Sequence, residues 1–477
     1  MSLRTNLIVG AIFVALLAFV YYHEIRGGEQ RRTEIERAKE LLSFEESAAR
    51  RVELDRGDTL VVLQREDDEW RLRAPVEDVA DQEAVERLLR NLRETERERV
   101  VADSAAAAGN EALAARYGLD RPRLRVLVEL ASGPLDTIVF GAESPAERYA
   151  YAQQRGANRQ IFVVRLWRFD NLNKGAFDLR DRRVLPFDQE QVQAIRLDWP
   201  ESTVAAERVE QASWQITAPA RTRADQAAVR SLLSRLANGK VKAFVAESPG
   251  EPELAGFGLA PVSTLELTLF IGAERAEKRL RVGNRTAGGG YFARDMSARQ
   301  VFEVDSLLVG DLAKRFDDLR DKKLLRFDRS AVTRIELAHA GGETVAAVRD
   351  SGEAWSVVVP RRLPAKSWKI SGLLTDLENL EAAGFVAAGD RQASRAAPLL
   401  TASLAGDAGQ LAQVRLAGTT GDTLYAFCAG DPTVYRVLRS EFEAIDLRLP
   451  DLAEVDAPAA PQADGGAPVE ARPGDDL

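Results

Sequence analysis

The feature that most constrains the fold is a pattern that occurs three times along the chain. Each copy has a tryptophan followed five residues later by a proline: Trp70 and Pro75, Trp214 and Pro219, Trp355 and Pro360. Ten residues after each proline, apolar residues begin at the spacing i, i+3, i+4, i+7, typical of one face of an α-helix. These residues are Val85, Leu88, Leu89 and Leu92; Val229, Leu232, Leu233 and Leu236; and Ile370, Leu373, Leu374 and Leu377. Since the copies match in register, the sequence predicts three repeats of one unit.

Strand patterns surround the predicted helix in each copy. Residues 52–54, 195–197 and 335–337 alternate between apolar and charged, as half-buried strands do. An aromatic-Gly-Leu element at 117–119 and 257–259 has no counterpart in the third copy, which is shortened near residues 391–408. Several strands beside a single helix predict an α+β fold in which each repeat is an antiparallel sheet packed with a helix.

The landmark residues of the repeats fit structural roles. We expect each tryptophan to end a strand and bury its ring beneath the helix. Each proline should end strand pairing because it has no N–H donor. Asp81 and Asp225 lie six residues after Pro75 and Pro219, where a helix N-cap accepts free backbone N–H groups. Ser367 lies one position later in its copy and is predicted to cap the third helix.

The N-terminal segment Leu7–Tyr22 contains no charged residue. With its neighbours it provides about 20 residues, enough for a helix across the ~30 Å hydrocarbon layer of a membrane. We therefore predict a single-pass anchor in the lipid bilayer of a membrane. A cleaved secretory signal and a buried soluble helix are the alternatives; no small-x-small cleavage site follows the segment. The charges around it leave the orientation open.

The repeats divide the chain into six parts. They are a transmembrane anchor (1–25), a charged helical spacer (26–43), repeat units at 44–186, 187–326 and 327–455, and a disordered tail (456–477). The third unit is predicted to be a shortened terminal copy. The tail is rich in Ala, Pro, Gly and Asp, a composition that cannot form a packed core.

Composition excludes several classes of function. The net charge of -9 argues against non-specific nucleic-acid binding, which needs clustered Lys and Arg. Cys428 is the only cysteine, and His23 and His339 are the only histidines, so the sequence predicts neither an intrachain disulfide nor a metal site of usual type. No phosphate-binding loop is recognisable, and Gly288–Gly290 is interpreted as a hairpin turn. No cofactor is predicted.

Carboxylates and two unshared tryptophans leave alternatives open. Asp81 and Asp225 could form a catalytic pair, but their place at a helix start favours capping. The pair Asp181 and Asp321 would form either a salt-bridged turn between units or a docking surface. Trp199 and Trp368 would be core residues or exposed contacts. No catalytic constellation is found, so the chain is predicted not to be an enzyme.

The repeats resemble a bacterial family catalogued as domain of unknown function 4340. The resemblance rests on the Trp-x-x-x-x-Pro motif, the apolar helix series, the aromatic-Gly-Leu element, and the strand ends at Gly141 and Gly283. It covers nearly everything between Phe44 and Pro450. The resemblance implies one N-terminal anchor, in the bacterial inner (cytoplasmic) membrane, and a periplasmic or extracytoplasmic soluble part. It also implies an accessory role beside gliding-motility-type ABC transporter components.

Three functional hypotheses follow. The first is a membrane-anchored scaffold or binding protein with protein partners in an envelope complex, favoured because repetition comes without reactive residues. The second is a lipid or small-ligand carrier, which needs an apolar cavity between sheet and helix. The third is an envelope hydrolase that uses carboxylates, which needs a cleft lined by them.

Overall fold

A computed structural model describes residues 39–103, 111–145, 148–156, 159–209, 213–350, 354–386, 390–418 and 421–454. The predicted membrane segment Leu7–Tyr22, most of the charged spacer and the predicted tail lie outside these residues. Within the described ranges, no helix is both long enough and apolar enough to cross a membrane.

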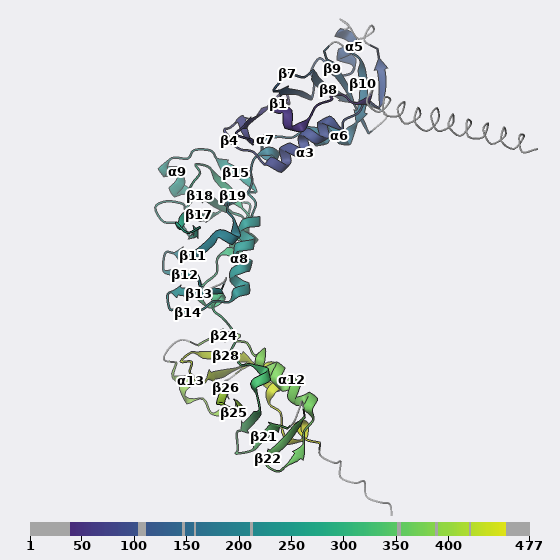
Figure 1. Cartoon of the computed structure of the whole chain (residues 1–477). Coiled ribbons are helices and arrows are strands. Elements are labelled where there is room, and N and C mark those ends of the chain that lie inside the picture. The colour runs from purple at the N-terminus through teal and green to yellow at the C-terminus, as the bar shows by residue number, and fades with distance from the viewer. Residues whose placement is uncertain are drawn as a thin grey trace, which may run out of the picture. The chain divides into compact units, whose positions relative to one another are not determined.

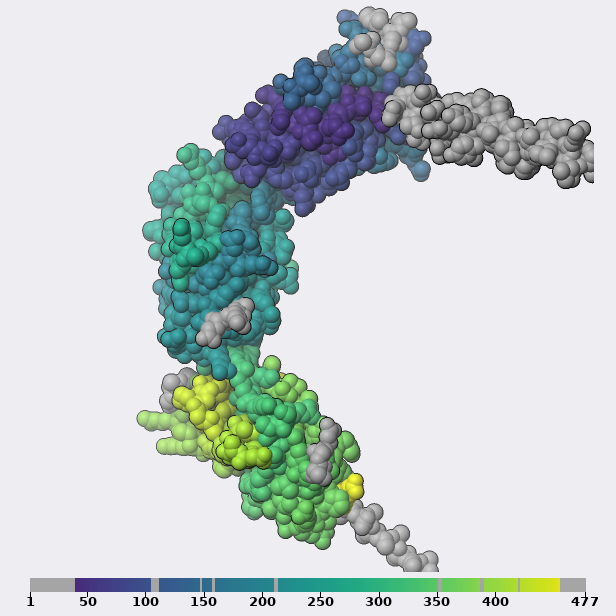
Figure 2. Space-filling view, viewed as in Figure 1, coloured from purple at the N-terminus to yellow at the C-terminus, as the bar shows by residue number. Residues whose placement is uncertain are grey.

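The described residues form three antiparallel sheets with helices, which confirms the α+β prediction at the level of tandem units (Figure 1). Each sheet is built from one continuous stretch of sequence. Figure 2 colours the atoms of the chain by residue number in the same order. The chain divides into two compact units. The first contains the first sheet with Lys240–Ala246 and Phe302–Val304, and the second contains the remainder.

The first sheet has the order β4-β3-β2-β1-β6-β8-β9-β10-β5, and β7 pairs with β6. The strands are β1 (Ala49–Asp55), β2 (Leu60–Glu66), β3 (Glu69–Ala74), β4 (Asp78–Val79), β5 (Arg99–Ala102), β6 (Leu124–Leu130), β7 (Gly133–Pro134), β8 (Thr137–Glu143), β9 (Tyr149–Arg155) and β10 (Ile161–Arg165). The helices are η2 (Glu46–Ala48), α3 (Gln82–Arg93), α5 (Glu111–Arg116), α6 (Leu166–Leu172) and α7 (Ala176–Leu179).

The second sheet has the order β14-β13-β12-β11-β16-β17-β18-β19-β15. The strands are β11 (Val192–Trp199), β12 (Ser202–Val209), β13 (Ser213–Ala218), β14 (Thr222–Arg223), β15 (Ala243–Ala246), β16 (Leu265–Ile271), β17 (Ala276–Arg285), β18 (Tyr291–Asp295) and β19 (Val301–Val304). The helices are η3 (Gln189–Gln191), α8 (Gln226–Asn238), α9 (Glu251–Gly256), α10 (Ser306–Leu312) and α11 (Phe316–Leu319).

The third sheet has the order β23-β22-β21-β20-β25-β26-β27-β28-β24. The strands are β20 (Arg334–His339), β21 (Thr344–Arg349), β22 (Trp355–Val359), β23 (Leu363–Pro364), β24 (Gly384–Phe385), β25 (Pro398–Gly406), β26 (Gly409–Ala417), β27 (Thr423–Cys428) and β28 (Val434–Leu438). The helices are η4 (Arg329–Ala331), α12 (Ser367–Glu378), α13 (Arg391–Arg395), α14 (Arg439–Ile445) and α15 (Leu449–Leu452). Every strand of the second sheet has a counterpart here.

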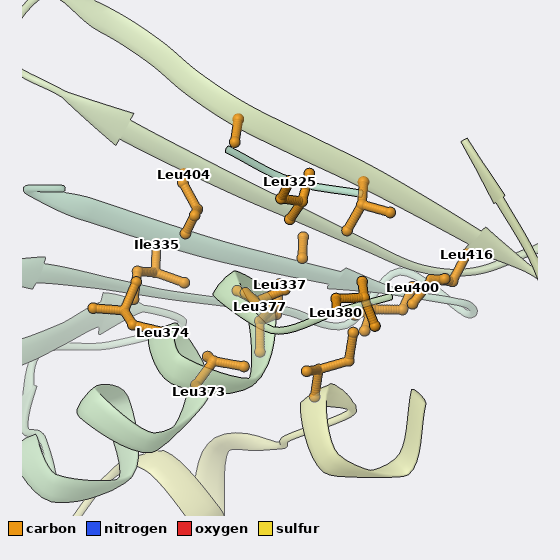
Figure 3. Packing of buried hydrophobic residues seen from close by; sticks show 14 of the residues in the cluster. Leu325, Ile335, Leu337, Leu373, Leu374, Leu377, Leu380, Leu400, Leu404 and Leu416 are labelled. Atoms are coloured by element: carbon orange, nitrogen blue, oxygen red, sulfur yellow. The ribbon is translucent and has the colours of Figure 1, made fainter. Parts of the chain in front are cut away.

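One helix crosses a face of each sheet, because it joins the two opposite edge strands. In the first sheet, α3 follows edge strand β4 and leads to edge strand β5. The apolar residues predicted from the spacing are all buried in α3, α8 and α12. In the third repeat, Leu373, Leu374 and Leu377 of α12 face Ile335 and Leu337 of β20 (Figure 3).

The first unit includes residues that the sequence assigned to the charged spacer. Leu41 and Leu42 are buried in the first core, and the Leu41 N–H donates to the Thr95 carbonyl. Glu40 forms an isolated β-bridge with Glu96. The first repeat therefore begins ahead of Phe44, within the range predicted to be the spacer.

Candidate functional site

The landmark tryptophans are buried and the landmark prolines follow strand ends. The prediction that each tryptophan ends a strand is wrong, because Trp70 and Trp214 are the second residues of β3 and β13 and Trp355 is the first residue of β22. Trp70, Trp214 and Trp355 are 4%, 4% and 6% exposed. Strands β3, β13 and β22 each end at the residue before the proline. The peptide bonds that precede Pro75, Pro219 and Pro360 are all cis.

Two of the three helix starts carry the predicted cap. The Asp81 side chain accepts the Ala84 N–H at the start of α3, and the Asp225 side chain accepts the Ala227 and Ala228 N–H groups at the start of α8. The prediction for Ser367 is wrong, because Ser367 already lies inside α12. The N-cap is Lys366, whose side chain makes no capping hydrogen bond.

A glutamine that sequence reasoning missed binds the tryptophan strand in two repeats. Gln82 Oε1 accepts the Trp70 N–H at 2.7 Å, and Gln82 Nε2 donates to the Trp70 carbonyl at 3.0 Å. Gln226 makes the same bonds with Trp214. The signal was present, since Ala-Asp-Gln occurs at 80–82 and 224–226 and is absent from the third copy.

A recurring arginine was also missed. Arg65, Arg208 and Arg349 each donate through Nη1 to a backbone carbonyl of the short helix before the first strand, at 3.0, 3.0 and 2.9 Å. Arg208 and Arg349 also lie 5.5 and 5.2 Å from the ring centres of Trp214 and Trp355. These contacts place the arginines in the framework of each repeat.

The segment that closes a repeat, here called the connector, comprises residues 179–183 in the first repeat and 319–323 in the second. It forms backbone hydrogen bonds on two sides. In the first connector, the Leu179 carbonyl accepts the Asp81 N–H at 2.8 Å and the Arg182 carbonyl accepts the Val241 N–H at 2.7 Å. All four residues belong to the first compact unit.

The second connector makes the equivalent bonds, all inside the second compact unit. The Leu319 carbonyl accepts the Asp225 N–H at 2.8 Å, and the Lys322 carbonyl accepts the Ala382 N–H at 2.8 Å. The repeated Leu-Arg-Asp sequence at 179–181 and 319–321 is thus explained by main-chain pairing.

Connector side chains add ion pairs and ring contacts. Arg180 is 4% exposed, pairs with Asp78 and stacks 3.4 Å from the Phe244 ring centre. Asp181 pairs with Arg183 at 2.6 Å, and Asp321 contacts Arg326. These pairs agree with the salt-bridged-turn interpretation of the two aspartates.

The unshared tryptophans differ from each other. Trp199 is 8% exposed and Arg315 stacks 4.2 Å from its ring centre, so it packs into the second repeat. Trp368 is 69% exposed on α12, with Lys369 5.0 Å from its ring centre. Only Trp368 is available as an exposed contact.

The remaining residues singled out from the sequence, His339, Cys428 and Gly288–Gly290, do not form a common site. His339 ends β20, with Nε2 3.1 Å from Asp446 Oδ1. Cys428 ends β27, and burial raises the pKa of its thiol to about 12. Gly288–Gly290 lie in the hairpin between β17 and β18, as predicted. Over the described ranges, no three His, Cys, Asp or Glu side chains are grouped to hold a metal ion.

A cavity beside the second connector is the candidate binding site. It measures about 580 Å³ and is lined by residues of β13, the start of α8 and the connector. All of its lining residues belong to the second compact unit. We call it the connector cavity. A second cavity of about 960 Å³ involves Arg320, Phe385 and Asp431, also in this unit.

Comparison with known proteins identifies one relationship. The family described as Domain of unknown function (DUF4340) matches residues 70–213 and 214–400, in two adjacent segments. Neither the curated proteins nor the solved structures contain a match.

Proposed function

This chain belongs to the family Domain of unknown function (DUF4340), and from that premise we propose that it is a membrane-anchored scaffold or binding protein. The anchor would be Leu7–Tyr22, with the three repeats outside the cytoplasm. The partners would be subunits of an ABC-transporter-type envelope complex, in which this chain is an accessory component. The family resemblance and the uncharged N-terminal segment support this arrangement.

The proposal rests on what the residues shared among the repeats bind. The tryptophans, capping aspartates, Gln82 and Gln226, and the connector backbone all bind other parts of the same chain. Shared residues thus maintain the framework, and the residues that differ between repeats are left to contact partners.

Exposed apolar side chains on the helices fit such partner contacts. Trp167 on α6, Leu307 on α10 and Trp368 on α12 are 51%, 79% and 69% exposed. Tryptophan is among the residues that contribute most to binding energy at protein interfaces.

A carrier would instead need an apolar cavity between helix and sheet. In the third repeat that space is occupied by one continuous cluster of buried side chains, which includes Leu337, Leu377 and Leu404 (Figure 3). The filled interface favours a scaffold over a carrier.

Affinity purification from detergent-solubilised membranes tests the proposal. We expect tagged wild-type chain to retain transporter permease and ATPase subunits, and Trp167→Ser/Leu307→Ser/Trp368→Ser to lose most of them. Val262→Ser is the matched control, because Val262 is 64% exposed but lies outside these helices. Recovery of no protein above the untagged background would contradict the scaffold role.

A further inference from the structure

The connector cavity has an excess of positive charge in a chain whose net charge is -9. Five basic residues and three acidic residues line it, which leaves two positive charges in excess. The basic residues are Arg223, Arg230, Lys322, Lys323 and Arg326, and the acidic residues are Asp225, Asp321 and Glu381.

Two of the three carboxylates are already engaged. Asp225 caps α8 by accepting the Ala227 and Ala228 N–H groups. Asp321 accepts the Lys323 N–H at 3.0 Å and contacts the Arg326 guanidinium. Across the described part of the chain, the side chains of the other four basic residues make no ion pair: Arg223, Arg230, Lys322 and Lys323.

The backbone holds these basic residues around one space. The Arg223 carbonyl accepts the Asp321 N–H at 3.0 Å, which joins β14 to the connector. Lys323 forms a β-bridge with Glu381, which fixes the other end of the connector. The pKa of the Arg326 guanidinium is lowered, first by burial and then by the charge of Arg223, despite the contact with Asp321.

The repeat architecture does not require this charge. In the first repeat, the residue equivalent to Arg223 is Val79: the Val79 carbonyl accepts the Asp181 N–H, as the Arg223 carbonyl accepts the Asp321 N–H. Four residues after the glutamine that binds the tryptophan strand, α3 has Glu86 where α8 has Arg230. In the shared segment Leu-x-Phe-Asp, Pro186 stands where Arg326 does. The first connector therefore forms with neutral or acidic residues at three of these positions.

We propose that the connector cavity binds a phosphate group. A phosphate monoester carries about -1.5 to -2 charges near pH 7, which matches the excess of two positive charges. A guanidinium group can donate two parallel N–H bonds to two oxygens of one phosphate, and an ammonium group adds a compact positive charge. A volume of about 580 Å³ is larger than one phosphate needs, so the group would belong to a small phosphate ester or a lipid headgroup.

Calorimetric titration of the full chain in detergent tests the proposal with inorganic phosphate and sn-glycerol 3-phosphate. We expect saturable binding that weakens as salt rises. Arg230→Gln/Lys323→Gln should weaken binding about tenfold or more, since each change removes one charged contact. Arg235→Gln/Lys369→Gln removes equal charge elsewhere and should leave binding unchanged. Circular dichroism checks that each variant is folded.

Vesicles distinguish the source of the phosphate. The full chain, with a fluorescent probe attached to the connector, would be reconstituted into phosphatidylcholine vesicles that contain phosphatidic acid at fractions from zero upward. The probe's fluorescence would be measured at each fraction. A saturable change that needs phosphatidic acid and Lys323 assigns a lipid headgroup, whereas binding of soluble esters alone assigns a free metabolite. Failure of both arms, or equal affinity in Arg230→Gln/Lys323→Gln, would overturn the proposal. These outcomes do not depend on whether partner subunits co-purify.

Discussion

Gln226 binds both backbone groups of Trp214 with one side-chain amide: Oε1 accepts the Trp214 N–H at 2.7 Å, and Nε2 donates to the Trp214 carbonyl at 3.0 Å. Nε2 also donates to the Ala224 carbonyl at 2.7 Å. The first residue of α8 thus supplies the acceptor for the Trp214 N–H, while the Trp214 carbonyl also accepts the Ala224 N–H at 3.3 Å.

We predict that Gln226→Ala destabilises the second repeat by about 1–3 kcal/mol, because it leaves the partly buried Trp214 N–H without its acceptor, although the Trp214 carbonyl keeps the Ala224 N–H at 3.3 Å. Hydrogen exchange read by mass spectrometry should show faster exchange of the peptide that contains the Trp214 N–H. Gln193→Ala is the control, since within the described residues the side chain of Gln193 makes only a local bond, to the Gln191 carbonyl two residues away. Unchanged exchange at Trp214 in Gln226→Ala would contradict the role given to the glutamine.

Helix capping gives a prediction in two directions. Asp81→Ala should cost about 1 kcal/mol, because the Ala84 N–H loses its acceptor. Lys366→Asp should gain up to about 1 kcal/mol, because α12 begins without a side-chain cap. The loss of the Lys366 Nζ bond to the Pro450 carbonyl would reduce that gain. Thermal unfolding of the full chain measures both changes, and a lower melting temperature for Lys366→Asp would count against the second.

Local periodicity made much of the fold predictable from sequence. The leucine stripes and the positions of Asp81 and Asp225 follow from spacings within one helix, and the structure places them as expected. The assignment of Ser367 failed because it followed residue type, whereas capping depends on where the helix begins.

Contacts across long sequence separations could not be predicted in this way. Arg180 reaches Phe244 because the connector pairs with the segment after α8, a consequence of sheet topology. The connector cavity is similar. Its cations run from Arg223 to Arg326 in the sequence, and only the pairing of the connector brings them together. The excess of these basic residues over the carboxylates around them cannot be recognised until the backbone pairing of the connector is known.

The buried ion pair in the first connector supplies a stability prediction. Arg180 is 4% exposed and bonds Asp78 through Nε at 2.8 Å. Arg180→Gln should destabilise the first unit by about 3 kcal/mol, because it leaves a carboxylate without its partner in a buried setting. Arg320→Gln should cost less, since Asp317, the carboxylate of its ion pair, is 61% exposed, and Asp431, which also feels the charge of Arg320, keeps its hydrogen bonds from Thr433 and Tyr435. Denaturant unfolding would measure both, and equal losses would contradict the distinction.

The single cysteine reports on the third repeat. Burial, with a smaller effect from Asp431, raises the pKa of Cys428 to about 12 from its ordinary 9.0. The folded chain at pH 8 should therefore react with iodoacetamide roughly a hundredfold more slowly than the unfolded chain, because so little thiolate is present. Mass spectrometry over time measures the two rates. Similar rates in buffer and in guanidinium would contradict the burial of the thiol.

Asp431 supplies a pH-dependent prediction. Burial opposes its ionisation, but hydrogen bonds from Tyr435 and Thr433 and the charge of Arg320 outweigh burial, so the pKa of Asp431 lies below its ordinary 3.8. A carboxyl whose pKa is lowered by folding stabilises the protein above its unfolded pKa, and this contribution is lost as the pH falls through the folded pKa. Asp431→Asn should therefore cost about 1 kcal/mol at pH 7, after discounting for solvent screening.

The difference between wild type and Asp431→Asn should narrow as the pH falls below about 4, because the wild-type carboxylate then protonates. Tyr435→Phe removes only the hydroxyl and so measures the contribution of its hydrogen bond. The other sheets place Phe162 and Phe302 at the equivalent position, so packing tolerates the ring, while the bond to Asp431 is removed. Asp407→Asn, an exposed turn residue, is the control. Melting temperatures across pH 3–7 test this account, and a difference independent of pH would show that Asp431 acts through packing alone.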